Sequence, residues 1–276
     1  MTMAAGTASS PVAPPIAPSP GGLAFGLRAA GILLRRDLVH FVRRPVRIAA
    51  AVGTPVMVWL LAGGGVGESF RPAGLEVSYA LFLLPGIAML VAVFAAIFGA
   101  IGVIEDRRAG ALRAVLASPV PRWSIALGRA AGTAAVGLVQ AAAVLPLAVV
   151  AGGRVGAIDL AVIVLALACA AIGTGALGVA LAWRCATVAS FHAAMNLVFM
   201  PMWLLSAPFF PAEGGHPAIA LVMRVNPLTW CTEAVRGPFV GEAGGAASLV
   251  GPACFAAAGL ALATWTVARR AVPPGG

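Results

Sequence analysis

Lysine is absent from this chain of 276 residues, so all 18 of its basic residues are arginine. This absence excludes a Walker A phosphate loop, a Schiff-base lysine and a lysine general base within the chain. The four cysteines are far apart and form no CxxC pair, and the three histidines are scattered. Zinc and redox motifs need closer spacing, so we expect no metal site here.

Charge is also scarce, because charged residues make up 10% of the chain and hydrophobic residues 61%. A soluble globular protein carries about 25% charged residues, so a bundle of membrane helices is the expected class. The arginines flank apolar segments, where orientation and anionic lipid headgroups explain them better than nucleic acid does. Usage rich in Ala, Gly and Arg without Lys suggests a GC-rich bacterial genome, and hence a bacterial inner (plasma) membrane.

Apolar runs long enough to cross a bilayer recur along the chain. About 20 apolar residues, at roughly 1.5 Å each, cover a hydrocarbon core of roughly 30 Å. The run from Tyr79 to Ile104 contains no charged residue and is the clearest of them. We predict an all-α integral membrane protein, with six transmembrane helices at about 48–62, 79–104, 125–150, 160–182, 189–210 and 248–268.

The two ends and the segment before the first span differ from the spans. Residues 1–22 are rich in Ala, Pro, Ser and Gly and are predicted to be a disordered tail, and 271–276 form a short C-terminal tail. The body of six spans then covers 48–270. In 23–47, leucines share one helical face and arginines the other, which indicates an amphipathic helix lying along the headgroups. The alternative is an ordinary positive flank that sets topology. The residues assigned to this interfacial helix are Arg35, Arg36, Asp37, Phe41 and Arg43.

The distribution of arginine predicts the orientation. If the N terminus is inside, 14 of the 18 arginines fall on inner segments, and only Arg71, Arg154, Arg224 and Arg236 lie outside. Lys and Arg are enriched in cytoplasmic loops, so both termini are expected in the cytoplasm.

The segment 105–123, between the second and third spans, is longer than a minimal loop. Ala111, Leu112, Val115 and Leu116 form one apolar stripe of a short helix, and Ser118-Pro119 ends it. A short amphipathic helix at the mouth of the bundle suits docking of another protein. The alternative is a membrane-surface helix that only caps the bundle.

A second short helix is predicted late in the chain. Asn226 suits the N-cap and Pro227 the first helical position, and Gly237 follows the last residue, Arg236. The segment is too short and too polar to cross a membrane.

Three stretches resemble one family. LLPGIAMLVAVFAAIFGAIGVIEDRRAGALRAVLASPVPRWSIALGRA looks like the core of type-2 ATP-binding-cassette (ABC) exporter permeases, in which a Pro-Gly opens the second span and an acidic-basic cluster closes it. LLRRDLVHFVRRPVRIAAAVGTPVMVWLL is similar to the family's interfacial helix and first span, and NLVFMPMWLLSAPFFP with VNPLTWCTEAVRG resembles its C-terminal signature. The chain departs from that pattern at Ala207-Pro208.

The resemblance implies a division of labour. A separate cytoplasmic ABC ATPase, in two copies, would bind ATP and Mg, so this chain is expected to be no enzyme and to hold no cofactor itself. A second permease subunit, identical or a paralogue, would complete the path within the membrane lipids. The residues that would couple to the ATPase are Glu105, Asp106, Arg107, Arg108, Gly110, Leu112, Arg113 and Leu116. A re-entrant outer hairpin between spans five and six would include Asn226, Pro227, Leu228, Thr229, Arg236 and Gly237.

The cargo is the least determined part of the prediction. The spans hold almost no ionisable groups, which disfavours a proton relay and suits an amphipathic or hydrophobic cargo. Gln140, His192 and Asn196 are the polar candidates for lining the path. The single-domain organisation looks most like the daunorubicin-resistance type of multidrug exporter, which implies a drug or antibiotic. Polysaccharide, teichoic-acid or lipid export is the alternative within the family. A secondary transporter and an intramembrane lipid-modifying enzyme are the alternatives from other classes.

Overall fold

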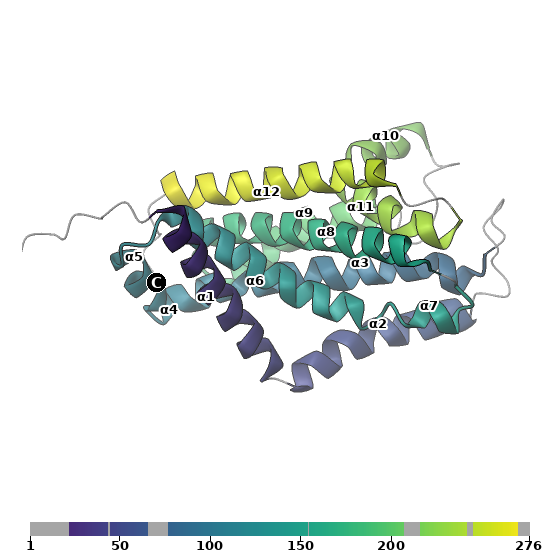
Figure 1. Cartoon of the computed structure of the whole chain (residues 1–276), viewed down its shortest axis with the longest axis horizontal. Helices are drawn as coiled ribbons and strands as arrows, with labels where there is room; N and C mark the ends of the chain where they lie inside the picture. Colours follow the sequence, from purple (N-terminus) through teal and green to yellow (C-terminus); the bar gives the residue numbers. More distant parts are fainter. Residues whose placement is uncertain are drawn as a thin grey trace, which may run out of the picture.

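The computed structural model describes residues 22–43, 45–65, 77–153, 155–206, 216–241 and 245–269. Every regular element in these ranges is a helix, as the composition predicts. Figure 1 shows the long helices side by side along the longest axis of the molecule. The predicted N-terminal tail, except Gly22, and the C-terminal tail lie outside the described residues.

Four long helices form the body of the bundle: α3 (Tyr79–Gly99), α6 (Arg122–Ala142), α8 (Ala157–Arg184) and α12 (Val250–Arg269). α3 is the most enclosed of them, and Leu83, Leu84 and Met89 are completely buried. Glycine lets the helices approach closely, since a Cβ at Gly137 of α6 would lie 2.6 Å from the Ala92 carbonyl oxygen of α3. Small residues at such crossings are how membrane helices gain packing contacts without a hydrophobic driving force.

Two helices precede the body and form a V in Figure 1. The first, α1 (Leu23–Val42), crosses α6, where a Cβ at Gly128 would lie 2.8 Å from the backbone of Ala30. The second, α2 (Pro45–Gly65), packs mainly on α3, and its Trp59 Nε1 donates a hydrogen bond of 2.8 Å to the Ala80 carbonyl. The first helix ends at Val42 and the second begins at Pro45, so the domain boundary drawn after residue 47 lies within the first turn of α2. Proline disfavours a helical conformation in the residue that precedes it, which ends α1 earlier.

At the end of α3 the chain continues into two short helices. After Ala100, α4 (Ile101–Arg108) prolongs the direction of α3, and α5 (Ala111–Ala117) follows a turn at Gly110. Gly110 adopts φ +74°, a left-handed conformation that glycine reaches without steric cost. We call residues 101–117 the elbow. In Figure 1 it lies at the same end of the bundle as the C-terminal end of α12.

The remaining helices cluster at the opposite end or along one side. They are α7 (Leu147–Val150), α9 (Val188–Leu204), α10 (Pro217–Val225), α11 (Pro227–Arg236), η1 (Gly237–Phe239) and η2 (Ala246–Leu249). α10 and α11 form a helical hairpin that joins α9 to the last long helix. Figure 1 shows this hairpin at the end of the bundle away from the elbow.

Within the described residues, four helical stretches are long and apolar enough to cross a membrane: Tyr79–Arg108, Arg122–Val150, Ala157–Arg184 and Ala246–Arg269. The other two predicted spans coincide with the shorter apolar helices Val52–Gly65 and Val188–Leu204. The predicted fifth span would extend to residue 210, but 207–215 lie outside the described residues. Four spans are therefore supported by length and composition, and the count of six stays a prediction.

Candidate functional site

The elbow holds both exposed and internal side chains, although the sequence assigned all of them to one docking surface. Glu105 and Arg108 are exposed, whereas Leu112 is buried and Leu116 packs against the core. Gly110 provides the turn between the two short helices. The side chain of Arg113 lies outside the described part of the structure. The apolar stripe of α5 therefore faces the bundle, and a partner would meet the exposed residues.

Arg107 points into the protein and binds the end of α8. Its Nη1 donates to the Cys185 carbonyl at 2.7 Å, and its Nη2 lies 3.1 Å from each of the carbonyl oxygens of Ala182 and Trp183. The residue is 5% exposed. The last carbonyls of a helix lack partners within the helix and carry its negative partial charge, so a guanidinium satisfies them well. Arg107 thus fastens α4 to α8 from within.

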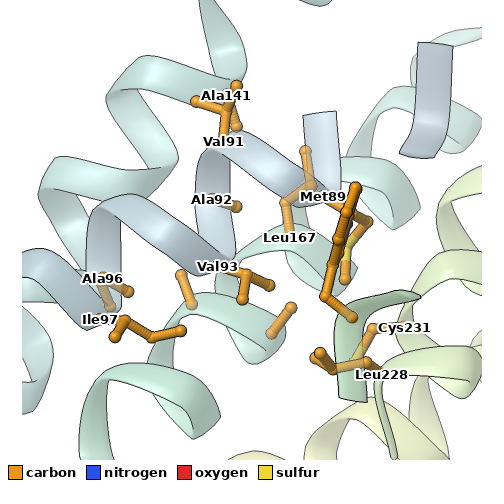
Figure 2. Close-up of a cluster of buried hydrophobic side chains, with 14 of the residues drawn as sticks. Met89, Val91, Ala92, Val93, Ala96, Ile97, Ala141, Leu167, Leu228 and Cys231 are labelled. Atoms are coloured by element: carbon orange, nitrogen blue, oxygen red, sulfur yellow. The ribbon is translucent and has the colours of Figure 1, made fainter. Parts of the chain in front are cut away.

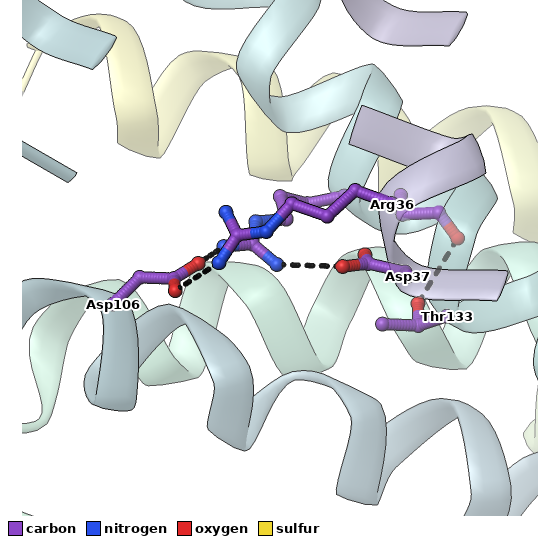
Figure 3. A network of polar contacts seen from close by, with 6 residues as sticks. Arg36, Asp37, Asp106 and Thr133 are labelled. Atoms are coloured by element: carbon purple, nitrogen blue, oxygen red, sulfur yellow. Dashed lines mark hydrogen bonds and ion pairs between the residues drawn. The ribbon is translucent and has the colours of Figure 1, made fainter. Parts of the chain in front are cut away.

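Asp106 belongs to an ion network that joins three helices, shown in Figure 3. Arg36 Nη2, from α1, donates to Asp106 Oδ1 at 2.6 Å. Arg129 of α6 donates from Nη1 to Asp37 Oδ1 at 3.0 Å and pairs with Asp106 through Nη2. We call Arg36, Asp37, Asp106 and Arg129 the ion network. It ties the amphipathic helix α1 to both the elbow and the bundle.

Three side chains of the ion network are largely withdrawn from solvent, because Arg129, Asp106 and Asp37 are 7%, 13% and 18% exposed, whereas Arg36 is 38% exposed. Removing one partner from a buried pair costs about 3–5 kcal/mol, since the other charge is left uncompensated. Burial raises the pKa of Asp37 above its ordinary value, although the nearby Arg129 and Arg36 guanidiniums act to lower it. Asp37 also lies against Gly132, where a Cβ would come within 2.6 Å of Oδ2.

The other predicted residues of the interfacial helix divide by face. Arg35 and Arg43 are exposed, while Phe41 is 7% exposed and turns inward. Arg36 and Asp37 are intermediate in exposure and belong to the ion network. The inner face of the helix therefore contains charged residues of the ion network as well as apolar residues.

A groove of about 700 Å³ lies between the V of α1 and α2 on one side and α3, α4 and α6 on the other. All four residues of the ion network line it, together with Glu105 and His40. Apolar residues of the spans line the rest of the groove: Pro55, Leu90, Val91, Phe94, Phe98 and Val136. The groove therefore combines a charged part with an apolar part.

The three polar residues predicted to line a path are not brought together. Gln140 is buried on α6 and lines the groove. His192 of α9 lies beside Phe98, with ring centroids 6.0 Å apart, and its Nδ1 is 3.0 Å from the Val188 carbonyl. Asn196 is exposed on the outer surface of α9. Of the three, Gln140 is the one that lines the described groove.

The predicted short helix after residue 226 forms α11, and its N-terminus is capped as expected. Asn226 Oδ1 accepts from the Leu228 amide at 3.0 Å, its Nδ2 donates to the Met202 carbonyl, and Pro227 takes the first position. Thr229 Oγ1 donates to the Leu205 carbonyl at 3.2 Å. These bonds fasten the start of α11 to the end of α9.

The body of α11 is inserted into the bundle. Leu228 and Cys231 are completely buried, and Figure 2 shows them in one apolar cluster with Met89 of α3 and Leu167 of α8. Arg236 is also buried and stacks over the ring of Phe82 at 4.3 Å.

Gly237 was predicted to follow the end of the helix, and α11 does end at Arg236. Gly237 has φ −44°, in the right-handed helical region, and begins the 3-10 helix η1, so no left-handed cap forms.

Arg129 is the residue that sequence reasoning missed. It was counted among the inner arginines, and no site was assigned to it. The signal was available, because a single arginine within the Ala- and Gly-rich run of a span must find an anionic partner. Asp37, between the arginines of α1, was the complementary signal. In the described residues no group of three His, Cys, Asp or Glu side chains could hold a metal ion.

Comparison with known proteins gives two findings. Residues 28–240 match the family model described as ABC-2 type transporter. The chain is also similar to a protein of Pyropia yezoensis named "Putative transport permease ycf38", with 25% identity over 208 residues, 74% of this chain and 71% of that protein. The matched region contains most of α1, the elbow, the ion network and α11. The chain therefore belongs to the ABC-2 type transporter family, as a multi-pass membrane permease.

Proposed function

We propose that this chain is the membrane subunit of an ATP-driven ABC exporter in a bacterial plasma membrane, with six spans and both termini in the cytoplasm. Membership of the family implies an ABC ATPase as partner. In our proposal two ATPase copies bind ATP and Mg, and a second permease subunit, identical or a paralogue, completes the path. The family favours this function over a secondary carrier or an intramembrane enzyme.

The observation that carries the proposal is the connection of the elbow to the rest of the bundle. The elbow continues α3 directly, Arg107 fastens it to α8, and Asp106 fastens it to Arg36 of α1 and Arg129 of α6. A partner that displaced the exposed side of the elbow would therefore move four helices together. A helix that merely capped the bundle would need no buried charges.

The hairpin of α10 and α11 supports a re-entrant element at the opposite end. α11 is ten residues long, yet most of its side chains are buried among α3, α8 and α12. α10 instead leaves Ile219, Leu221 and Val222 exposed. We assign the hairpin to the outer side, where it would limit release of cargo. Membrane lipids or the second permease subunit would cover the exposed apolar residues of α2 and α9.

The cargo that we favour is amphipathic or hydrophobic, such as a drug or antibiotic. The support is the groove, which has both charged and apolar lining and a size suited to a small organic molecule. A polysaccharide or teichoic acid would need a longer polar surface than the groove offers. Multidrug export is therefore our first choice of function and glycopolymer export the second.

The test is co-purification of an ATPase with the tagged chain, expressed with its neighbouring genes and extracted in mild detergent. The double variant Glu105→Ala/Arg108→Ala changes two exposed elbow residues and should release the ATPase while the chain stays monodisperse. Arg224→Ala is the matched control, because Arg224 is exposed on α10, at the other end of the bundle. An intact chain that never brings down an ATPase would refute the proposal. Loss of the ATPase in the control as well would refute the elbow as the docking site.

A further inference from the structure

We propose that the groove between the V of α1 and α2 and the bundle binds a lipophilic organic cation. The identification of this cation as cargo rests on the proposed exporter function. The binding site itself stands on the charges, rings and volume of the groove.

Among the described residues, the charged part of the groove holds more carboxylates than guanidiniums. Asp37, Glu105 and Asp106 line it with three carboxylates, whereas Arg36 and Arg129 supply two guanidiniums. Both guanidiniums already pair with Asp37 or Asp106. Glu105 forms no ion pair with any residue in the described ranges. Among the described charges of the groove, the Glu105 carboxylate is therefore the one left for an incoming cation.

The apolar part of the groove suits the body of such a cation. The rings of Phe94 and Phe98 are 6.2 Å apart on successive turns of α3, and both line the groove. Pro55 of α2 and Val136 of α6 line it as well. Aromatic faces attract cations, and in a site with little water this attraction reaches about 2 kcal/mol. The volume of about 700 Å³ falls within the range usual for small-molecule sites.

An anionic amphiphile fits less well, because its headgroup would meet the carboxylate of Glu105 and two guanidiniums that already pair with Asp37 and Asp106. The surrounding surface is rich in exposed arginine, including Arg35, Arg43 and Arg108. Anions are therefore expected to gather on that outer surface. Within the groove, the local carboxylates favour a cation.

The test uses the full chain in lipid nanodiscs and radiolabelled tetraphenylphosphonium, an aromatic cation. Tetraphenylborate has nearly the same size and rings with the opposite charge, so it serves as the matched competitor. We expect saturable binding that unlabelled cation displaces and tetraphenylborate does not. Equal displacement by both ions would overturn the assignment of charge.

Two variants of α6 locate the site. Val136 lines the groove and is half-buried, whereas Val139 is 54% exposed and does not line it. Val136→Trp should fill the groove and weaken binding at least about tenfold, and Val139→Trp should leave binding unchanged. Phe94→Ala is the second variant, should Val136→Trp fail to fold, and is expected to weaken binding about fivefold. Wild-type affinity in a folded Val136→Trp or Phe94→Ala chain would overturn the inference.

The charge is tested with Glu105→Gln, which removes the carboxylate of Glu105 and leaves the four residues of the ion network unchanged. Binding of tetraphenylphosphonium should fall about fivefold, and its preference over tetraphenylborate should disappear. Unchanged preference would assign the selectivity to another group and overturn the role of Glu105.

Failure of this inference and failure of the proposed function give different results. If an ATPase co-purifies with the chain but Val136→Trp leaves cation binding unchanged, the exporter function is supported and the groove is overturned as the binding site. If the cation binds in the groove but no ATPase co-purifies, the binding site is supported and the exporter function is overturned.

Discussion

Arg107 offers the sharpest test of the internal architecture, because the sequence placed it on the partner surface and the structure places it inside. We consider Arg107→Met, which keeps a long side chain and removes the guanidinium. The carbonyls of Ala182, Trp183 and Cys185 at the end of α8 would lose their donor. The packing of the aliphatic part would be largely preserved.

The expected cost follows from these contacts. A hydrogen bond from a charged group contributes about 1.5–3 kcal/mol net, and three such bonds from one guanidinium are not additive. Desolvation of Arg107 in the wild type offsets part of the gain. We therefore expect a loss of about 3 kcal/mol in the free energy of unfolding. Arg108→Met, on the exposed neighbour, should change it by about 0.5 kcal/mol or less.

Cys231 provides a natural reporter of unfolding, because it is completely buried in α11. Replacing Cys169, Cys185 and Cys254 by alanine leaves it as the one thiol of the 276-residue chain. Its reaction with a fluorogenic maleimide during heating in mild detergent gives an unfolding midpoint. We expect a clear fall in the midpoint for Arg107→Met, an intermediate fall for Arg107→Lys and none for Arg108→Met. Lysine keeps the charge but lacks the planar fork that reaches several carbonyls at once.

The reasoning is refuted by an Arg107→Met chain that keeps the wild-type midpoint and yet loses its ATPase. That result would return Arg107 to the partner surface. A lowered unfolding midpoint in Arg107→Met, with the ATPase still bound at low temperature, would support the role of Arg107 in holding α4 against α8.

Two further predictions concern helix contacts. Gly128→Ala should lower the free energy of unfolding by about 1–3 kcal/mol, because the new methyl group would lie 2.8 Å from the backbone of Ala30, which cannot move aside. The control Gly31→Ala has nothing within 4 Å of the new methyl group and should be neutral or stabilise by about 0.5–1 kcal/mol in the same maleimide assay. Equal effects of the two variants would contradict the close crossing of α1 and α6. Asn226→Ala should lower the free energy of unfolding by about 1–2 kcal/mol, because α11 loses its N-cap and the hydrogen bond to the Met202 carbonyl. The Cys231 thiol of α11 should then react with the maleimide at a lower temperature, and an unchanged midpoint would show that the cap is dispensable.

The sequence was sufficient for the helical class and for the positions of the long helices. Uninterrupted apolar runs predict spans strongly, and α8 at Ala157–Arg184 extends the predicted 160–182 by a few residues at each end. Local chemistry also predicted the start of α11, because Asn226 and Pro227 act within one turn. The short helix of the elbow was predicted for the same reason.

The direction in which charged side chains point could not be predicted in the same way. Asp106, Arg107 and Arg108 are consecutive, and helical geometry sends them to different sides. Asp106 and Arg107 reach partners 70 to 78 residues distant in sequence, such as Arg36 and Cys185, which no local pattern reveals. The groove is likewise formed by five helices and depends on how α1 and α2 diverge from the bundle. Tertiary arrangement alone determines both.

Burial of arginine also bears on the predicted orientation. A rule based on arginine counts assumes that each arginine reports the side of the membrane on which it lies, yet Arg107, Arg129 and Arg236 are buried and hold helices together. Removing Arg107 and Arg129 from the fourteen inner arginines, and Arg236 from the four outer ones, leaves twelve against three. The asymmetry persists without the structural arginines. Cytoplasmic termini therefore stay the prediction that the arginine distribution favours.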